Sequence, residues 1–211
     1  MKKDGNSYQI DAEKFLDREQ RKKLLKATKE KADLDLMYGR RTWIVRYMLL
    51  DLALYSGLRV SELADLKIAD LTLTGSTPSL IVRKGKGSKK RIVYIDKELV
   101  KHLKKFIELK LTTFDEKISD ESPLFTGRNG AHVQPITLMK SFKVAAKNAG
   151  LPSSYSIHCT RHTYATYLLQ DCSNLRYVQK QLGHSNISMT ALYADIAPEE
   201  NSKLAQMISR D

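Results

Sequence analysis

The chain has 211 residues, of which 42% are hydrophobic, and 36 lysines and arginines against 24 acidic residues give a net charge of +12. This length and apolar content predict a folded globule with a real core and exclude wholesale disorder. The excess of positive charge favours a polyanionic partner such as nucleic acid, although ribosomal and membrane-surface proteins share this balance.

The cysteines and the apolar segments restrict the compartment. Cys159 and Cys172 form no CxxC pair, and the charged start MKKDGNSYQ does not resemble a secretory signal peptide. We therefore expect a reducing, cytoplasmic environment. The most apolar stretch, residues 43–55, contains Arg46 and Asp51 and is shorter than the roughly 18 apolar residues that a membrane span needs. It predicts a buried core helix.

The first third of the chain predicts helices. Residues 1–14 are polar and indicate a loose lead-in. Asp17 is expected to begin the first helix as its N-cap, with Gln20 three residues later completing a capping box. A second, mostly buried helix is expected over residues 40–56, where Gly57 ends it.

A short third helix is expected over residues 59–66, and the pattern then changes. Residues 71–95 carry β-branched and alternating positions separated by Gly, Ser and Pro, which predicts three short antiparallel strands. Residues 112–135 indicate a long surface connection. The other expected helices cover residues 97–111, 136–150, 160–171, 174–183, 186–193 and 199–209. The predicted fold class is mainly α with a small three-stranded antiparallel β-sheet, that is, α+β.

Two pairs of residues suggest a site for an anion. His158 and Arg161 lie three residues apart at the start of a predicted helix, so they project from one face beside backbone amides that attract phosphate. Arg59 and Glu62 have the same spacing after a turn, and the carboxylate can hold the guanidinium in one orientation. Each pair alone is also compatible with a plain helix cap or structural ion pair. His162 points elsewhere on its helix and is expected to be structural.

The segment RKGKGSKKR, residues 83–91, places basic residues around two glycines at a predicted hairpin tip, where a backbone can approach a phosphodiester closely. Lys86, between the glycines, is expected to project furthest outward. A solvated basic turn without function has the same composition. The predicted DNA contacts of this segment are Lys84, Lys89, Lys90 and Arg91.

Near the end of the chain, Gly183 and His184 end one predicted helix, and Tyr193 lies on the next. Any one of ten tyrosines is most often a core or surface residue. Two arginines close to this phenol would, however, favour its phenolate form.

Four blocks, GLRVSEL, KGKGSKKR, HCTRHTYAT and LGHSNISMTALY, occur in this order. Together they resemble the signature blocks of the tyrosine recombinases, which include the phage integrases and the Xer recombinases. The similarity extends from about Phe15 to the end of the chain. The segment HCT departs from the family by lacking a bulky aliphatic residue before Arg161, which concerns packing. The resemblance implies the catalytic residues Arg59, Lys86, His158, Arg161, His184 and Tyr193.

The resemblance implies the catalytic domain of a site-specific DNA recombinase or integrase. Tyr193 would attack the scissile phosphate of double-stranded DNA and form a 3′-phosphotyrosyl intermediate, which retains the energy of the broken bond. Arg59 and Arg161 would stabilise the charge of the transition state together with a hydrogen bond from His184.

The remaining roles concern proton transfer and orientation. His158 would assist removal of the tyrosine proton, and Lys86 would protonate the departing 5′ oxygen. Glu62 would orient Arg59. No metal ion, ATP or other cofactor is expected, since the sequence has no acidic cluster spaced for magnesium and no zinc-type Cys/His set.

The resemblance also implies partners and alternatives. We expect self-association on DNA, as a tetrameric synapse, and no membrane. A type IB topoisomerase shares this chemistry but exchanges no partners, and the LGHSNISMTALY block argues against it. A non-cleaving DNA-binding regulator of the same fold is the second alternative, and the intact six positions argue against that.

The expected domain organisation is a lead-in at residues 1–14 and a catalytic domain at 15–211, in which 199–211 form a C-terminal helix. Family members usually carry a helical core-binding domain ahead of the catalytic domain, and Arg59 comes too early to leave room for one. We expect that domain to be absent, either because the chain is a fragment or because it is a natural short form. The C-terminal helix would pack into a neighbouring protomer or fold back on its own domain.

Overall fold

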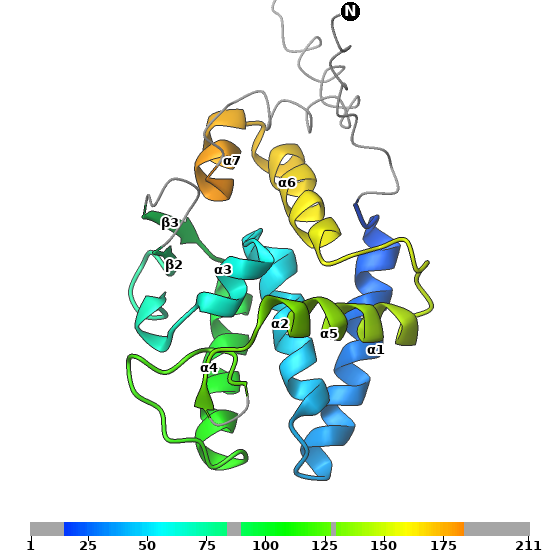
Figure 1. Ribbon diagram of the computed structural model, residues 1–211. Helices are drawn as coiled ribbons and strands as arrows, with labels where there is room; N and C mark the ends of the chain where they lie inside the picture. Colours follow the sequence, from blue (N-terminus) through cyan, green and yellow to red (C-terminus); the bar gives the residue numbers. More distant parts are fainter. Residues whose placement is uncertain (1–14, 84–89, 128–129, 184–211) are drawn as a thin grey trace, which may run out of the picture.

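The computed structural model describes residues 15–83, 90–127 and 130–183. These ranges contain seven α-helices, one short 3-10 helix and three strands, so the prediction of a mainly α fold with a small antiparallel sheet is confirmed (Figure 1). The bounds are α1 Arg18–Met37, α2 Thr42–Ser56, α3 Val60–Asp65, the 3-10 helix η2 Ile68–Asp70, β1 Leu71–Thr72, β2 Ser79–Val82, β3 Arg91–Tyr94, α4 Lys97–Thr112, α5 Pro135–Asn148, α6 His158–Cys172 and α7 Leu175–Leu182. The helices expected at 186–193 and 199–209 lie outside the described residues.

Helix α2 is the centre of the domain, and α1, α4, α5 and α6 all pack against it, with α5 crossing α1 and α2 (Figure 1). A helix that is apolar on all sides is stable only where other elements cover it. Its buried residues include Met48, Leu49, Leu50, Leu52, Ala53 and Leu54.

The ends of the first two helices follow the local sequence signals. The Gln20 backbone N–H donates to the Asp17 side chain at 2.8 Å, and the Asp17 N–H donates to the Gln20 side chain at 3.1 Å, which is the predicted capping box. Gly57 ends α2 with φ of 62°, a left-handed conformation that favours glycine.

The sheet has the strand order β1-β2-β3, and both pairs of strands are antiparallel. In the register of β2 and β3, Leu80 pairs with Val93 and Val82 pairs with Arg91. Leu80 and Val93 are fully buried, so one face of the sheet belongs to the core. The predicted hairpin tip at residues 84–89 lies outside the described residues.

The connection between α4 and α5 differs in part from the expected surface loop. Residues 113–122 are exposed or half-buried, as predicted, but Leu124 and Phe125 are 0% and 1% exposed. The Leu124 N–H donates to the carbonyl of Leu66 at 2.8 Å, which holds this segment beside α3. The connection therefore contributes to the core.

Helix α6 is joined to the start of the described chain. The Leu16 N–H donates to Oγ1 of Thr163 at 2.8 Å, although 147 residues separate the two. Near the start of α6, Cys159 is buried, whereas Cys172 at its end is exposed.

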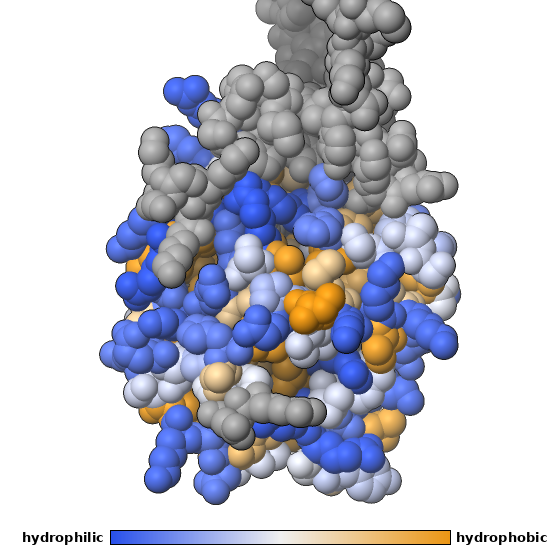
Figure 2. Space-filling view, in the orientation of Figure 1, coloured by the Kyte–Doolittle hydropathy of each residue, from blue (hydrophilic) through white to orange (hydrophobic). Residues whose placement is uncertain are grey.

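The face shown in Figure 2 is mainly hydrophilic, with hydrophobic residues in small separate patches. In the part of the chain that the structure describes, no helix has the length and apolar character that crossing a bilayer requires.

Candidate active site

The structure brings four of the predicted site residues to one place: Arg59, Glu62, Arg91 and Arg161. His158 is the first residue of α6, exposed, one turn before Arg161. Five of the predicted site residues lie outside the described residues: Tyr193, Lys86, His184, Lys84 and Lys89.

Arg59 is placed by the turn that Gly57 begins. It is the N-cap residue of α3, with an extended backbone, and its N–H donates to Oε2 of Glu62 at 2.8 Å. Its Nη1 donates to Oε1 of the same carboxylate at 2.9 Å. The Arg59 side chain is 31% exposed, so the guanidinium is fixed on one edge and open to solvent on another.

Glu62 is the anion at the centre of the site, and its side chain is only 4% exposed. Besides the two bonds from Arg59, it accepts hydrogen bonds from Nη1 and Nη2 of Arg91 at 2.7 and 2.8 Å. Burial by itself raises the pKa of Glu62, but the hydrogen bonds and charge of Arg91, the Arg59 N–H and the charge of Arg161 lower it to about 2. Glu62 is therefore a carboxylate at any physiological pH.

Arg161 lies between the ends of two helices and is 8% exposed. Its Nη1 donates to the carbonyl of Gly57 after α2 at 2.6 Å, and its Nη2 donates to the carbonyl of Leu182 at the end of α7 at 2.7 Å. The last carbonyls of a helix have no partner within the helix and carry partial negative charge, so they suit a guanidinium. These bonds fix Arg161 close enough to Glu62 to lower its pKa.

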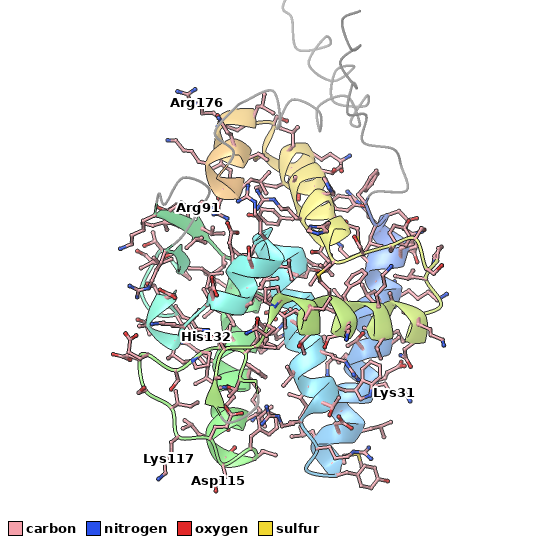
Figure 3. All side chains as sticks on the ribbon, viewed as in Figure 1. Lys31, Arg91, Asp115, Lys117, His132 and Arg176 are labelled. Carbon is pink, nitrogen blue, oxygen red and sulfur yellow. The ribbon has the colours of Figure 1, made fainter. Side chains whose placement is uncertain are left out.

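The predicted hairpin contacts differ in placement. Lys90 is exposed, as expected for a residue that meets DNA. The side chain of Arg91, which is labelled in Figure 3, is only 11% exposed. Both of its Nη atoms donate to Glu62, and its Nε donates to the carbonyl of Gln181 at 3.1 Å. This placement departs from the expectation that Arg91 faces a phosphodiester.

Gln181 is a residue that the sequence analysis missed. It is 1% exposed, its Oε1 accepts from the Tyr94 N–H at 3.1 Å, and its Nε2 donates to the hydroxyl of Tyr177 at 2.7 Å. These bonds join α7 to β3. The strong amphipathic pattern of α7 gave no sign of a buried amide, because a polar residue in that pattern is usually solvated.

The site holds more positive than negative charge. One carboxylate, Glu62, faces three guanidinium groups, those of Arg59, Arg91 and Arg161. Partly buried cations without an equal number of anions are costly, and a further anion would offset that cost. The arrangement is suited to binding an oxyanion at the open edge of Arg59.

Comparisons with known proteins identify relatives of this chain. The model of the phage integrase family matches residues 14–200. A tyrosine recombinase of Thermosipho africanus is 36% identical over 153 residues, which are 72% of this chain and 50% of the relative. Tyrosine recombinase XerC of Thermodesulfovibrio yellowstonii is 35% identical over 150 residues, 70% of this chain and 49% of the relative. The chain spans about half the length of these curated relatives.

Solved structures show the same fold. The crystal structure of XerA recombinase has a TM-score of 0.72 at 29% identity and covers 93% of this chain and 66% of its own. The XerH site-specific recombinase bound to difH substrate, in a pre-cleavage complex, has a TM-score of 0.71 at 24% identity over 90% of this chain and 52% of that one. The predicted catalytic-domain fold is confirmed by these matches.

Proposed function

Because this chain belongs to the phage integrase family, we propose that it is a site-specific recombinase catalytic domain that cleaves and rejoins double-stranded DNA through a 3′-phosphotyrosyl intermediate. The observation that carries the proposal is the surplus of guanidinium groups around Glu62, with one edge of Arg59 open. A phosphodiester is the anion that this site would take.

Arg59 is suited to a phosphate because only part of its guanidinium is used. Among the described residues, no hydrogen-bond partner is found for its Nε or Nη2. Two donors on one planar edge match two non-bridging oxygens of a phosphate. Arg161 adds a second fixed charge, held by the carbonyls of Gly57 and Leu182. Charge that grows on the phosphoryl oxygens in the transition state is stabilised by such preorganised donors.

The covalent step is assigned to Tyr193. Its Oη attacks phosphorus, the bond from phosphorus to the 5′ oxygen breaks, and the 3′ phosphate remains on the tyrosine. His158 assists removal of the phenol proton, and Lys86 protonates the 5′ oxygen as it leaves. His184 adds a hydrogen bond to the phosphate. The 5′ hydroxyl of another strand then attacks the phosphotyrosine in the reverse reaction, which rejoins the DNA without a nucleotide cofactor.

Duplex DNA is supported as the partner by the relatives, since the XerH recombinase is described bound to its difH substrate. We place the protein in the cytoplasm, with self-association on DNA through residues 199–211. Removing those residues is expected to weaken cooperative binding to a two-site DNA more than binding to a half-site. Equal losses, or no loss, would mean that the tail acts within its own domain.

The proposal is tested by trapping the covalent intermediate. The probe is a pool of duplexes with randomised inverted repeats, nicked near the expected cleavage position so that the released fragment diffuses away. The wild-type chain is expected to give an adduct that survives denaturant, and Tyr193→Phe is expected to give none while it binds DNA with nearly unchanged affinity. Binding without any adduct would favour a non-cleaving regulator, and relaxation of supercoiled plasmid without strand exchange would favour a type IB topoisomerase.

Two further measurements test the assigned roles. Cleavage is expected to continue in a chelator, because arginine and lysine side chains do the electrostatic work, and a strict requirement for magnesium would contradict this. Lys86→Ala is expected to slow cleavage of ordinary DNA but not of DNA whose leaving 5′ atom is sulfur, since a thiolate departs without a proton. Equal defects on both substrates would make Lys86 a phosphate contact only.

A further inference from the structure

The proposed function assigns Arg59 and Arg161 to the phosphate, and Arg91 contacts the groups that hold both of them in place. Its Nη1 and Nη2 donate to Glu62, which holds Arg59, and its Nε donates to Gln181, next to the carbonyl that holds Arg161. We propose that Arg91 is a positioning residue that fixes the orientation of Arg59 and Arg161, an inference that rests on the proposed function.

The carboxylate of Glu62 is shared between Arg59 and Arg91. Arg91 occupies one side of both carboxylate oxygens, so Arg59 gives Glu62 one guanidinium nitrogen and its own backbone N–H. Without the fork of Arg91, the buried carboxylate has unsatisfied lone pairs, and a second nitrogen of Arg59, which already contacts Glu62, is a donor that can satisfy them. The Arg59 guanidinium would then turn toward Glu62 and lose the open edge that a phosphate needs.

Arg91 also contacts the end of α7. Gly183 packs directly on Arg91, because a Cβ at that position would lie 2.7 Å from Cδ of Arg91. Between the Arg91 contact at Gln181 and this contact at Gly183 lies Leu182, whose carbonyl accepts from Nη2 of Arg161. Arg91 therefore fixes the turn that orients Arg161.

The contacts of residue 91 require an arginine. All three guanidinium nitrogens of Arg91 donate to two different elements, α3 and α7. A lysine has one nitrogen, so it can keep the charge beside Glu62 but cannot reproduce the fork and the Nε bond together.

A matched control lies on the other stem of the same hairpin. Arg83 follows β2, and its Nε donates to the buried carboxylate of Asp70. Among the described residues, no contact of Arg83 reaches Glu62 or α7. Arg83→Lys therefore changes an arginine–carboxylate pair at the hairpin without changing the supports of Arg59 and Arg161.

The test compares Arg91→Lys with Arg83→Lys in single-turnover formation of the covalent adduct. Arg91→Lys is expected to lower the rate by about 100-fold, as misplacement of positioned groups by about 1 Å does, while DNA half-saturation changes by less than about threefold. Arg83→Lys is expected to change both quantities by less than about threefold. Equal rate losses in the two variants, or unchanged cleavage by Arg91→Lys, would overturn the inference.

A second measurement does not depend on cleavage. In the DNA-free protein, NMR of the arginine side chains reports how fast each guanidinium rotates. Arg91→Lys is expected to speed the rotation of Arg59 and Arg161, and Arg83→Lys to leave both unchanged. If wild-type protein forms no adduct with any duplex, the proposed function fails and this measurement still decides the positioning role. Unchanged rotation in a folded Arg91→Lys protein would refute it.

Discussion

Two of the places where the described residues bury charge differ in how that charge is balanced. In the Glu62 network, made of Glu62, Arg59, Arg91 and Arg161, one carboxylate meets three guanidinium groups. The second place is the Lys110 network, in which Lys110, Glu116 and Thr126 form a closed triangle.

The three side chains of the triangle are joined to one another by hydrogen bonds. Nζ of Lys110 donates to Glu116 at 2.6 Å and to Oγ1 of Thr126 at 2.5 Å, and the Thr126 hydroxyl donates to Glu116 at 2.7 Å. Arg41 reaches Glu116 from the solvent side, with a side chain that is 45% exposed. The triangle ties α4 to the connection that follows it.

The comparison shows that buried charge alone does not identify a functional site. Burial lowers the pKa of Lys110, although Glu116 opposes this shift, so both networks contain perturbed groups. In the Glu62 network three guanidinium groups surround one carboxylate, and Nε and Nη2 of Arg59 have no hydrogen-bond partner among the described residues. In the Lys110 network, Lys110 and the exposed Arg41 share Glu116, and the buried Lys110 gives its hydrogen bonds to Glu116 and Thr126. The Lys110 network is a structural cross-link.

The largest expected effect separates the two networks by activity. Arg161→Lys is expected to lower single-turnover cleavage by about 100- to 1,000-fold, because one ammonium cannot hold two carbonyls and a phosphate oxygen together. Arg41→Lys makes the same chemical change at the Lys110 network, and its cleavage rate is expected to equal that of wild type. Similar losses in the two variants would remove the functional distinction.

A stability measurement tests the structural role of the Lys110 network. Lys110→Ala leaves Glu116 without its buried partner and is expected to lower the free energy of unfolding by about 3–5 kcal/mol. The double variant Lys110→Met, Glu116→Gln leaves no unpaired buried charge and is expected to lose less. In both, protein that remains folded is expected to cleave at the wild-type rate, and a cleavage defect would connect this network to catalysis.

Two glycines with the same φ of 62° provide a matched pair. A Cβ at Gly57 would lie 2.3 Å from the Tyr164 ring, whereas a Cβ at Gly39 would meet nothing within 4 Å. Gly39→Ala is expected to cost only the left-handed strain, about 1–2 kcal/mol. Gly57→Ala is expected to cost about 1–3 kcal/mol more and to slow cleavage, because the carbonyl of Gly57 accepts from Arg161. Equal unfolding energies would mean that Tyr164 moves freely.

A further expected effect is a pH dependence that appears only in acid. The folded pKa of Glu62, about 2, lies below its ordinary value of 4.5, so its contribution to stability is complete above pH 4.5 and is lost as the pH falls toward 2. The destabilisation caused by Glu62→Gln is therefore expected to shrink over this range, by at most about 3 kcal/mol. Denaturant unfolding at pH 6 and pH 3 measures it. Glu116→Gln is expected to show a change of the same sign, since the pKa of Glu116 is also lowered.

Local signals in the sequence predicted much of the fold correctly. The Asp17 capping box and the stop at Gly57 depend on neighbouring residues, and both are present as expected. The start of α6 at His158, before the expected residue 160, was harder to predict because no side chain caps that end. Burial of Phe125 was missed because a connection rich in proline and glycine gives no periodic pattern.

The candidate site was predictable only where the contacting residues are close together in the sequence. The pair Arg59 and Glu62 follows from a spacing of three residues, but Arg91 lies 29 residues from Glu62. One signal was available: alternation along β3 places Arg91 on the same face as the fully buried Val93, and an inward arginine needs an anion. The carbonyl partners of Arg161 left no signal, because every residue has a carbonyl.

The two cysteines of the chain both lie on α6, the helix that carries Arg161. The rates at which they react with a thiol reagent can therefore measure the opening of this helix. Cys172 is exposed, whereas Cys159 is 4% exposed and burial raises its pKa to about 12. Because thiol reagents attack the thiolate, Cys172 reacts in the native protein and Cys159 reacts only when α6 opens. The rate of the second labelling event therefore measures how often α6 opens, and its change on adding DNA would report how much the bound duplex closes the domain.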